Sequence, residues 1–305
     1  MSPVRLIAVL LCTAAISSFA DEPTPWEIDV DANVTLTQNS YTESWIGSEK
    51  GAISWASKLN FVAERQFTTI FNHRNTLKLQ FGQTKAQDEQ RSWGDFLKST
   101  DLIDFESLQR LTLSGWVEPF IAVRLISQFV DGTDSTQNHY VNPLSIFESF
   151  GIARPLVTRD AAKWNARFGG AVNQLIARYT RDATHDDYYT KTINSAGLEL
   201  VTELKAKAEE GLLDFSSLLT IYEALVSSEA EKTDGTSREN YWRYPDINWE
   251  NILSVNLTKY IMINLTAQLL YDRELHANAR IKEVLALGLT YKFNNVKKAE
   301  ETAKQ

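Results

Sequence analysis

The chain has 305 residues, with 31 Lys and Arg against 39 Asp and Glu and a formal net charge of −8. This acidic balance is the opposite of what a nucleic-acid-binding protein carries, so no nucleic-acid partner is expected. Cys12 is the only cysteine, which excludes an internal disulfide framework and a cysteine metal site.

The N-terminus predicts a cleaved secretory signal peptide over residues 1–20. Arg5 is the only charged residue before Asp21, residues 6–11 are apolar, and residues 18–20 fit the small-x-small pattern of a cleavage site. Beyond it, no run of about eighteen apolar residues follows, so no membrane-spanning helix is expected.

The first element after the signal peptide is an amphipathic strand. Residues 26–36 alternate strictly between apolar and polar side chains, which gives a β-strand one apolar and one polar face. Its length is about that of a tilted strand crossing a bilayer. The same pattern recurs along the chain and predicts twelve strands: 26–37, 53–64, 71–84, 102–112, 120–129, 146–154, 163–175, 193–205, 213–224, 249–258, 260–272 and 281–293.

The connections between these strands alternate between long and short. Turns such as 65–70 and 113–119 are short. The long connections are 38–52, 85–100, 130–145, 176–192, 225–248 and 272–280. Bacterial barrels have short periplasmic turns, long external loops and an even strand number. The sequence therefore predicts an all-β fold, a closed, antiparallel, up-and-down transmembrane β-barrel of about 12 strands, with 10 or 14 as alternatives, spanning residues 21–293.

Aromatic residues lie near the ends of the predicted strands: Trp26, Phe71, Phe120, Trp164, Trp249, Tyr260, Tyr271, Tyr291 and Phe293. Amphipathic rings favour the headgroup level, so this distribution indicates interfacial girdles, although aromatic residues are also common in any β-protein. The last predicted strand resembles the terminal strand that outer-membrane barrels present to their insertion machinery. A charged segment, 294–305, follows it and is predicted to be a polar periplasmic tail.

Four stretches carry a resemblance to a known family: 38–51, 75–82, 124–132 and 270–272. Residues 38–47 read QNSYTESWIG, and residues 124–132 read RLISQFVDG. The pattern resembles an uncharacterised outer-membrane family of Gram-negative bacteria, catalogued as domain of unknown function 3078, over roughly residues 26–293. The resemblance implies an outer-membrane β-barrel and brings no substrate and no catalytic residues.

The polar face of the strands predicts a lumen lined by charges of both signs. The candidate lumen-lining residues are Glu27, Asp29, Asp31, Lys58, Arg74, Lys78, Glu106, Arg110, Arg124, Gln128, Arg167, Glu199, Glu203 and Lys282. Two interpretations stay open. The charges line an aqueous pore, or they pair across the lumen and close it, since the interior of a twelve-stranded barrel lies between filled and open sizes. Small inward residues such as Gly169 and Gly197 indicate either open space or close packing.

No catalytic residue, cofactor or metal is predicted. A barrel lipase needs a serine beside a histidine on the lipid-level face, and no such pair shares a strand face in the predicted register. His73 lies near a periplasmic strand end, and the other three histidines fall in external loops. Carboxylates at 182–187 could suit calcium, but their spacing is not that of a recognised site.

The expected function is porin-like passage of small hydrophilic solutes through the outer membrane. The alternative is a closed structural or docking barrel that binds a partner through its external loops or its tail. The expected partners are outer-membrane lipid and the barrel-insertion machinery, and the oligomeric state is left open.

Overall fold

The protein is described by a computed structural model for residues 24–41, 49–113, 115–132, 137–182, 187–208 and 211–295, without the side chains of residues 182 and 187. The predicted signal peptide, residues 1–20, and residues 296–305 of the predicted tail lie outside this part. So do residues 42–48 of the first predicted external loop and residues 183–186.

Twelve antiparallel strands close into one barrel, as the sequence predicts. Each strand pairs with the next one in the chain, and the last strand returns to the first. The strands are β1 (Glu27–Asn39), β2 (Ala52–Thr68), β3 (Phe71–Ala86), β4 (Leu97–Leu111), β5 (Glu118–Ser127), β8 (Leu144–Arg159), β9 (Ala162–Asp182), β10 (Asp187–Ala208), β11 (Leu213–Ser227), β12 (Asp246–Asn256), β13 (Ile261–Tyr271) and β14 (Arg280–Asn294). The all-β fold class, the closure and the count of 12 strands are confirmed.

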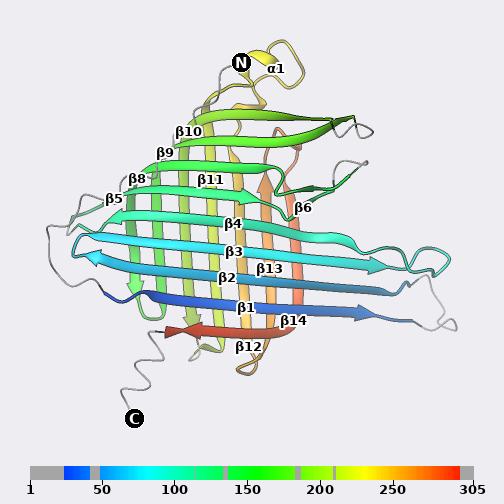
Figure 1. Ribbon diagram of the computed structural model, residues 1–305. Helices are drawn as coiled ribbons and strands as arrows, with labels where there is room; N and C mark the ends of the chain where they lie inside the picture. Colours follow the sequence, from blue (N-terminus) through cyan, green and yellow to red (C-terminus); the bar gives the residue numbers. More distant parts are fainter. Residues whose placement is uncertain are drawn as a thin grey trace.

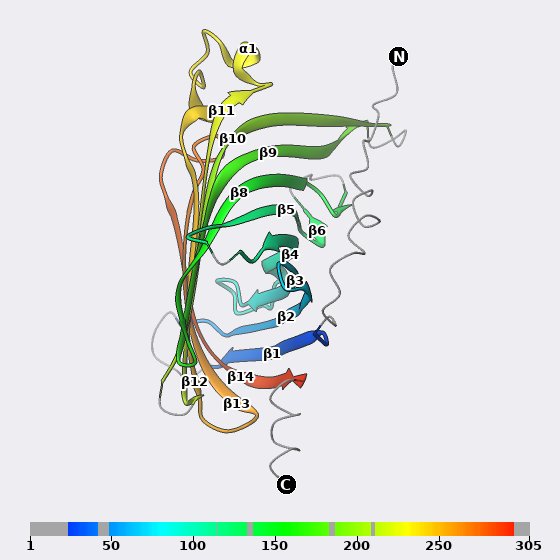
Figure 2. The same ribbon diagram turned by 90° about the vertical axis from the view of Figure 1, so that its left-hand side faces the viewer.

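The barrel wall forms two layers whose strands cross (Figure 1). The layer with β1–β5 lies in front of the layer with β11–β13, and β8, β9 and β10 curve from one layer into the other (Figure 2). Strands that tilt strongly against the barrel axis produce this crossing. The lumen lies between the two layers, so inward side chains of one layer face those of the other.

The seam, where the first strand pairs with the last, contains fewer residue pairs than the pairing of β1 with β2. β1 pairs with β2 over thirteen residues but with β14 over seven, and the last pair along the seam is Thr35 with Gly288. Asn295 extends the seam at its other end. Its Nδ2 donates to the carbonyl oxygen of Trp26 at 2.7 Å, and its Oδ1 accepts from the backbone N–H of Ile28 at 2.8 Å.

One end of the barrel carries short turns and the other carries long loops. The turn between β2 and β3 consists of residues 69–70, whereas residues 228–245 separate β11 from β12. Short turns face the periplasm in outer-membrane barrels, so we call this the periplasmic end and the opposite one the external end. Both β1 and β14 have their free ends at the periplasmic end.

The external loops contain structure that the sequence does not predict. β6 (Val130–Asp131) and β7 (His139–Tyr140) form a small two-stranded sheet. A short helix α1 (Ala230–Thr233) and a 3-10 turn η2 (Tyr241–Arg243) lie between β11 and β12. Within the described residues, no helix is long and apolar enough to cross a membrane.

The predicted loop over residues 176–192 is wrong in its extent. β9 and β10 continue as a paired hairpin through most of this segment, with Tyr179 opposite Tyr189. The two tyrosine rings stack with centroids 5.3 Å apart. This part of the hairpin packs against the β6–β7 loop and not against lipid, since Gln137 Nε2 donates to Thr180 at 3.0 Å and the ring of His139 lies beside that of Tyr188. The alternation that marks a membrane strand is therefore absent.

Candidate functional site

The inner wall of the barrel is identified by contacts between strands that are not neighbours. Arg74 on β3 donates to Glu203 on β10 over 3.2 and 3.5 Å, although several strands separate β3 from β10. The register then assigns every second residue of each strand to the same face. Thirteen of the fourteen predicted lumen-lining residues point inward: Glu27, Asp29, Asp31, Lys58, Arg74, Lys78, Glu106, Arg110, Arg124, Arg167, Glu199, Glu203 and Lys282.

Gln128 lies beyond the last residue of β5 and takes no part in the barrel wall. The carboxylate of Asp101 accepts hydrogen bonds from the backbone N–H groups of Phe129 and Val130, which ends the pairing of β5 and turns the chain into the external loop. Gln128 Nε2 donates to the carbonyl oxygen of Asn142 at 2.7 Å. Its position therefore supports the loop and not the lumen.

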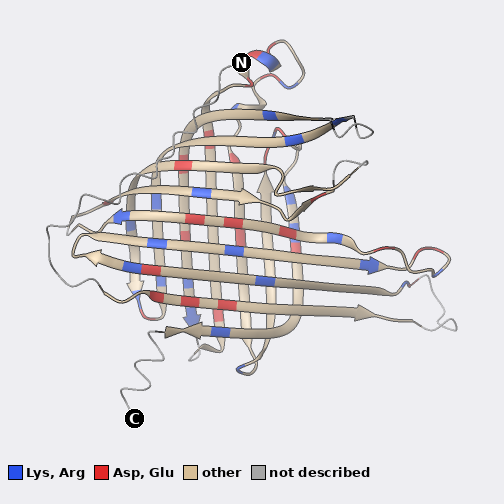
Figure 3. Cartoon of the chain, in the orientation of Figure 1, with Lys and Arg blue, Asp and Glu red and all other residues tan. Residues whose placement is uncertain are grey.

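Three arginine–carboxylate pairs lie on the inner wall between its middle and its periplasmic end. Besides Arg74 with Glu203, Arg124 donates to both carboxylate oxygens of Asp104 at 2.9 and 2.7 Å. Arg167 on β9 makes two contacts with Glu106 on β4. Charges of both signs lie along neighbouring strands in Figure 3. Two parallel N–H···O bonds fix geometry as well as charge, so these pairs are rigid bridges between strands.

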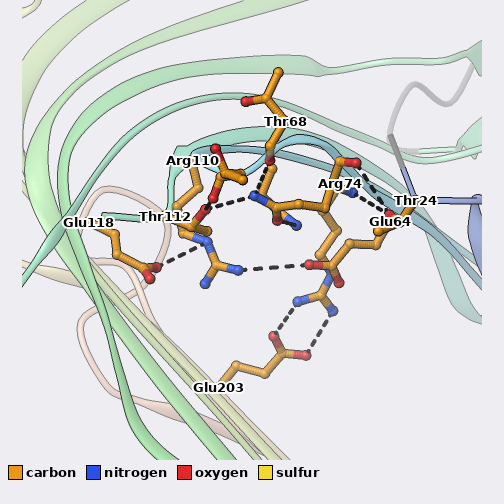
Figure 4. A network of polar contacts seen from close by, with 11 residues as sticks. Thr24, Glu64, Thr68, Arg74, Arg110, Thr112, Glu118 and Glu203 are labelled. Carbon is orange, nitrogen blue, oxygen red and sulfur yellow. Dashed lines mark hydrogen bonds and ion pairs between the residues drawn. The ribbon is translucent and has the colours of Figure 1, made fainter. Parts of the chain in front are cut away.

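A second group of polar contacts lies nearer the periplasmic end (Figure 4). Arg110 on β4 contacts Glu118 on β5 at 3.2 Å and Glu64 on β2 at 3.8 Å. Figure 4 shows this group directly beside the bridge from Arg74 to Glu203. The side chains of these five residues are between 14 and 30 % exposed, so little water reaches them.

The other charged residues of the predicted lumen set form no ion pair within the described part of the chain. These residues are Glu27, Asp29, Asp31, Lys58, Lys78, Glu199 and Lys282. Lys282 on β14 reaches the carbonyl oxygen of Ser99 at 3.3 Å, on the far side of the external mouth. Asp31 accepts from Thr290 at 3.4 Å. The structure thus divides the predicted lumen set into a paired group and an unpaired remainder that includes the acidic arc of β1.

Most strands carry at least one buried residue on the inner wall. The buried hydrophobic residues include inward positions on β2, β5, β8 to β11, β13 and β14, and the buried polar residues include Asp104, Glu199 and Thr290. The prediction that Phe120 belongs to an interfacial girdle is wrong. Phe120 points inward, is 4 % exposed, and packs against Ala122 and Ala153. A wide aqueous channel would leave these inward side chains open to water.

Inward glycines mark close approach between strands and not open space. A Cβ on Gly169 would lie 2.0 Å from the carbonyl oxygen of Phe150, and one on Gly197 would lie 1.9 Å from that of Glu223. Only a residue without a side chain fits at either place. Both glycines are in β9 and β10, the strands that curve between the two layers (Figure 2).

A cavity of about 630 Å³ opens at the periplasmic mouth. Its charged lining includes Lys207, Asp214 and Lys292. Lys292 Nζ donates to the carboxylate of Asp214 at 2.7 Å, so these two charges of the lining form an ion pair.

The outer wall is apolar between the two ends. Leu285, Leu287 and Leu289 on β14 are 70, 56 and 65 % exposed. Trp164, Trp249 and Tyr291, outward residues of the predicted girdles, are also exposed, and so is Tyr260 in the turn before β13. Glu148, Glu223 and Glu283 appear on the outer wall only close to its external end.

A polar cluster interrupts the apolar outer wall near the periplasmic end. The prediction that no serine shares a face with a histidine is wrong, because Ser107 on β4 and His73 on β3 both point outward. Gln109 Nε2 donates to Ser107 Oγ at 2.9 Å and lies 3.2 Å from His73 Nδ1. Asn75 Nδ2 lies 2.9 Å from His73 Nε2. Alternation alone could have found this cluster, since all four residues are at odd positions.

Metal-binding groups are absent from the described part of the chain: no three His, Cys, Asp or Glu residues gather as ligands there. The 182–187 carboxylates considered from the sequence fall largely outside that part. The closed wall of paired strands, the apolar outer belt and the polar interior together define a transmembrane β-barrel of the outer-membrane kind.

The family described as "Protein of unknown function (DUF3078)" matches residues 36–132, so the resemblance read from the sequence is confirmed over that stretch. No curated protein sequence matches the chain. Among solved structures, the chain is similar to the COG4313 outer membrane channel from Pseudomonas putida F1, with 13% identity over 91% of this chain and 98% of that one and a TM-score of 0.45. It is also similar to the translocator domain of the autotransporter NalP from Neisseria meningitidis, with 7% identity over 91% and 90% and a TM-score of 0.35.

Proposed function

We propose that this protein is an outer-membrane barrel whose resting lumen is closed by its own side chains, and that it has a structural or docking role. The supporting observation is the bridge from Arg74 on β3 to Glu203 on β10, which ties opposite parts of the wall together. Arg167 and Glu106 form a second bridge beside it. This arrangement favours the second of the two functions expected from the sequence.

Passage of small hydrophilic solutes is the second candidate, and the chemistry of the lumen filling favours it. Buried ion pairs contribute little net stability compared with well-packed apolar residues. A barrel that only had to stay closed would therefore gain nothing from ionic filling. Ion pairs can separate and be hydrated, and the cavity at the periplasmic mouth, with Lys207 and Lys292 in its lining, offers an entry for water.

Planar-bilayer conductance separates the two functions. The purified, refolded protein is compared with Arg74→Ala/Glu203→Ala, which removes both partners because a single substitution would leave a buried charge unpaired. Glu148→Ala, on the outer wall, is the control for loss of one charge. A closed barrel predicts no steps above background for the protein itself and for the control, and discrete steps for the double variant. Steps of similar size in all three would make the protein an open porin.

The outer-membrane location is tested separately by fractionation of cells that make the full chain. We expect the protein in the detergent-resistant outer-membrane fraction, with a gel mobility that shifts on heating as folded barrels do. Recovery in the soluble periplasmic fraction would contradict the location.

A further inference from the structure

We propose that the polar cluster on the outer wall binds the headgroup of an anionic phospholipid in the periplasmic leaflet. The cluster consists of Arg65, His73, Asn75, Ser107 and Gln109, all at outward positions of β2, β3 and β4. This role is independent of whether the lumen conducts.

The cluster lies at the depth of a phospholipid headgroup. Arg65 and His73 are register partners, and each is three or four residues from the turn at 69–70. At roughly 3.3 Å per residue this places them about 10 Å along the strands from the periplasmic end. Trp26, Phe67 and Phe71 surround them on the same face, and aromatic rings favour the headgroup level.

Arg65 supplies the charge that recognises a phosphate. Its guanidinium lies over the rings of Phe67 at 5.0 Å and Trp26 at 5.8 Å, and its Nε donates to the carbonyl oxygen of Thr24 at 2.8 Å. It forms no ion pair with any residue that the structure describes. Stacking and one hydrogen bond fix the guanidinium while leaving its terminal nitrogens for an anion, and a guanidinium binds phosphate through paired hydrogen bonds.

The neutral part of the cluster suits the glycerol and ester groups of the same lipid. Asn75 and Gln109 hold the ring of His73 from both sides, and Gln109 also donates to Ser107. Their amide oxygens and the Ser107 hydroxyl remain as outward-facing polar atoms. Acyl chains cannot hydrogen-bond them, and unsatisfied polar groups are costly in hydrocarbon.

Charge on the rest of the outer wall agrees with this choice of ligand. Two more cations lie over aromatic rings at the periplasmic end: Arg154 over Trp116 at 4.5 Å and Lys259 over Tyr260 at 5.5 Å. The outward glutamates lie at the external end instead. Cations over aromatic rings also lie at the external end, so it is the lack of outward glutamates on the described strands near the periplasmic end that favours an anionic headgroup there.

The test is native mass spectrometry of the full chain in detergent with added phosphatidylglycerol or phosphatidylcholine of identical acyl chains. We expect the protein to retain phosphatidylglycerol preferentially. Arg65→Gln should weaken that binding about tenfold, as expected when one charge-assisted hydrogen bond is lost, whereas Arg65→Lys should keep the preference. Heat-dependent gel mobility verifies that each variant is folded.

Lys85→Gln is the matched control. Lys85 is also an outward cation without an ion pair in the described structure and lies over Phe96 at 5.5 Å, but it stands at the external end of β3. It should leave phosphatidylglycerol binding unchanged. Asn75→Leu should lower the binding of both lipids, because it acts on the ester region. Equal retention of the two lipids by the unaltered protein, or an equal loss in Lys85→Gln and Arg65→Gln, would overturn the proposal.

Discussion

Leu287→Arg is the sharpest test of the barrel register. Leu287 is the middle residue of β14, with seven residues on each side, and points outward with 56 % of its surface exposed. Seven residues along a tilted strand span about half the hydrocarbon thickness, so this side chain lies near the bilayer midplane. An arginine at that depth on the lipid face costs about 2–4 kcal/mol. This corresponds to a roughly 30- to 700-fold smaller ratio of folded to unfolded protein.

Val284→Arg is the matched control on the same strand. Val284 is also apolar and 39 % exposed, but it points inward, towards the external mouth of the lumen. A charge there remains close to water, so we expect a loss of less than about 1 kcal/mol. Gly288, the nearest inward neighbour of Leu287, is unsuitable, because a Cβ there would lie 2.6 Å from the carbonyl oxygen of Val34.

The assay is urea-dependent folding into vesicles, followed by tryptophan fluorescence and by heat-dependent gel mobility. Comparable losses, or no loss for Leu287→Arg, would mean that Leu287 does not face lipid at mid-membrane. A larger loss for Val284→Arg than for Leu287→Arg would mean that the inner and outer faces of β14 are assigned the wrong way round. That result would also remove the basis for the lipid site, which depends on the same alternation in β2 to β4.

Three further outcomes follow from single contacts. The unaltered protein should show no phospholipid hydrolysis, and Ser107→Ala should behave in the same way. The reason is that Gln109 donates a hydrogen bond to the serine oxygen and both ring nitrogens of His73 face side-chain amides. Release of fatty acid that stops in Ser107→Ala would make the protein an enzyme. Gly197→Ala should lower the free energy of unfolding by about 1–3 kcal/mol, while Gly115→Ala, whose Cβ would meet no atom closer than 4.0 Å, should not, as measured by the same urea titration. Burial raises the pKa of Glu229, but hydrogen bonds from Lys232 and Lys191 outweigh it and hold the pKa below its usual value. Protection of the amides around α1, expressed relative to their intrinsic exchange rates, should therefore fall as pH falls through that lowered pKa, and Glu229→Gln should abolish this loss of protection.

The strands were predictable because a membrane imposes the same demand on every one of them. One face must be apolar for lipid, so a period of two appears in the sequence wherever the chain crosses the bilayer. The inward positions of residues such as Lys58 and Arg167 follow from the same alternation. Phe120 shows the limit: it sits at the start of β5, where an aromatic residue suits either a girdle or a packed interior, and its neighbours decide which.

The partners across the lumen could not be predicted from the sequence. Arg74 and Glu203 are 129 positions apart, and they meet only because of the tilt of the strands and the curvature of β8 to β10. Neither the tilt nor the curvature can be read from the alternation of apolar and polar residues. The β6–β7 sheet was missed for a different reason: each of its strands has two residues, and it is held by Asn142, whose side chain donates to Asp131 at 2.7 Å and to the carbonyl oxygen of Arg178 at 3.1 Å.

Because the seam between β1 and β14 is short, the number of paired residues between neighbouring strands is not the same all around the barrel. Beyond Thr35 and Gly288 the first and last strands no longer pair, although β14 continues outward to Arg280. The seven residue pairs of this seam are the fewest between any two neighbouring strands of the barrel wall, although β4 and β5 share only eight. The pairing of β1 with β14 ends close to Leu287, at mid-membrane. An opening between these two strands would therefore face the external leaflet, while the strands stay paired in the periplasmic half.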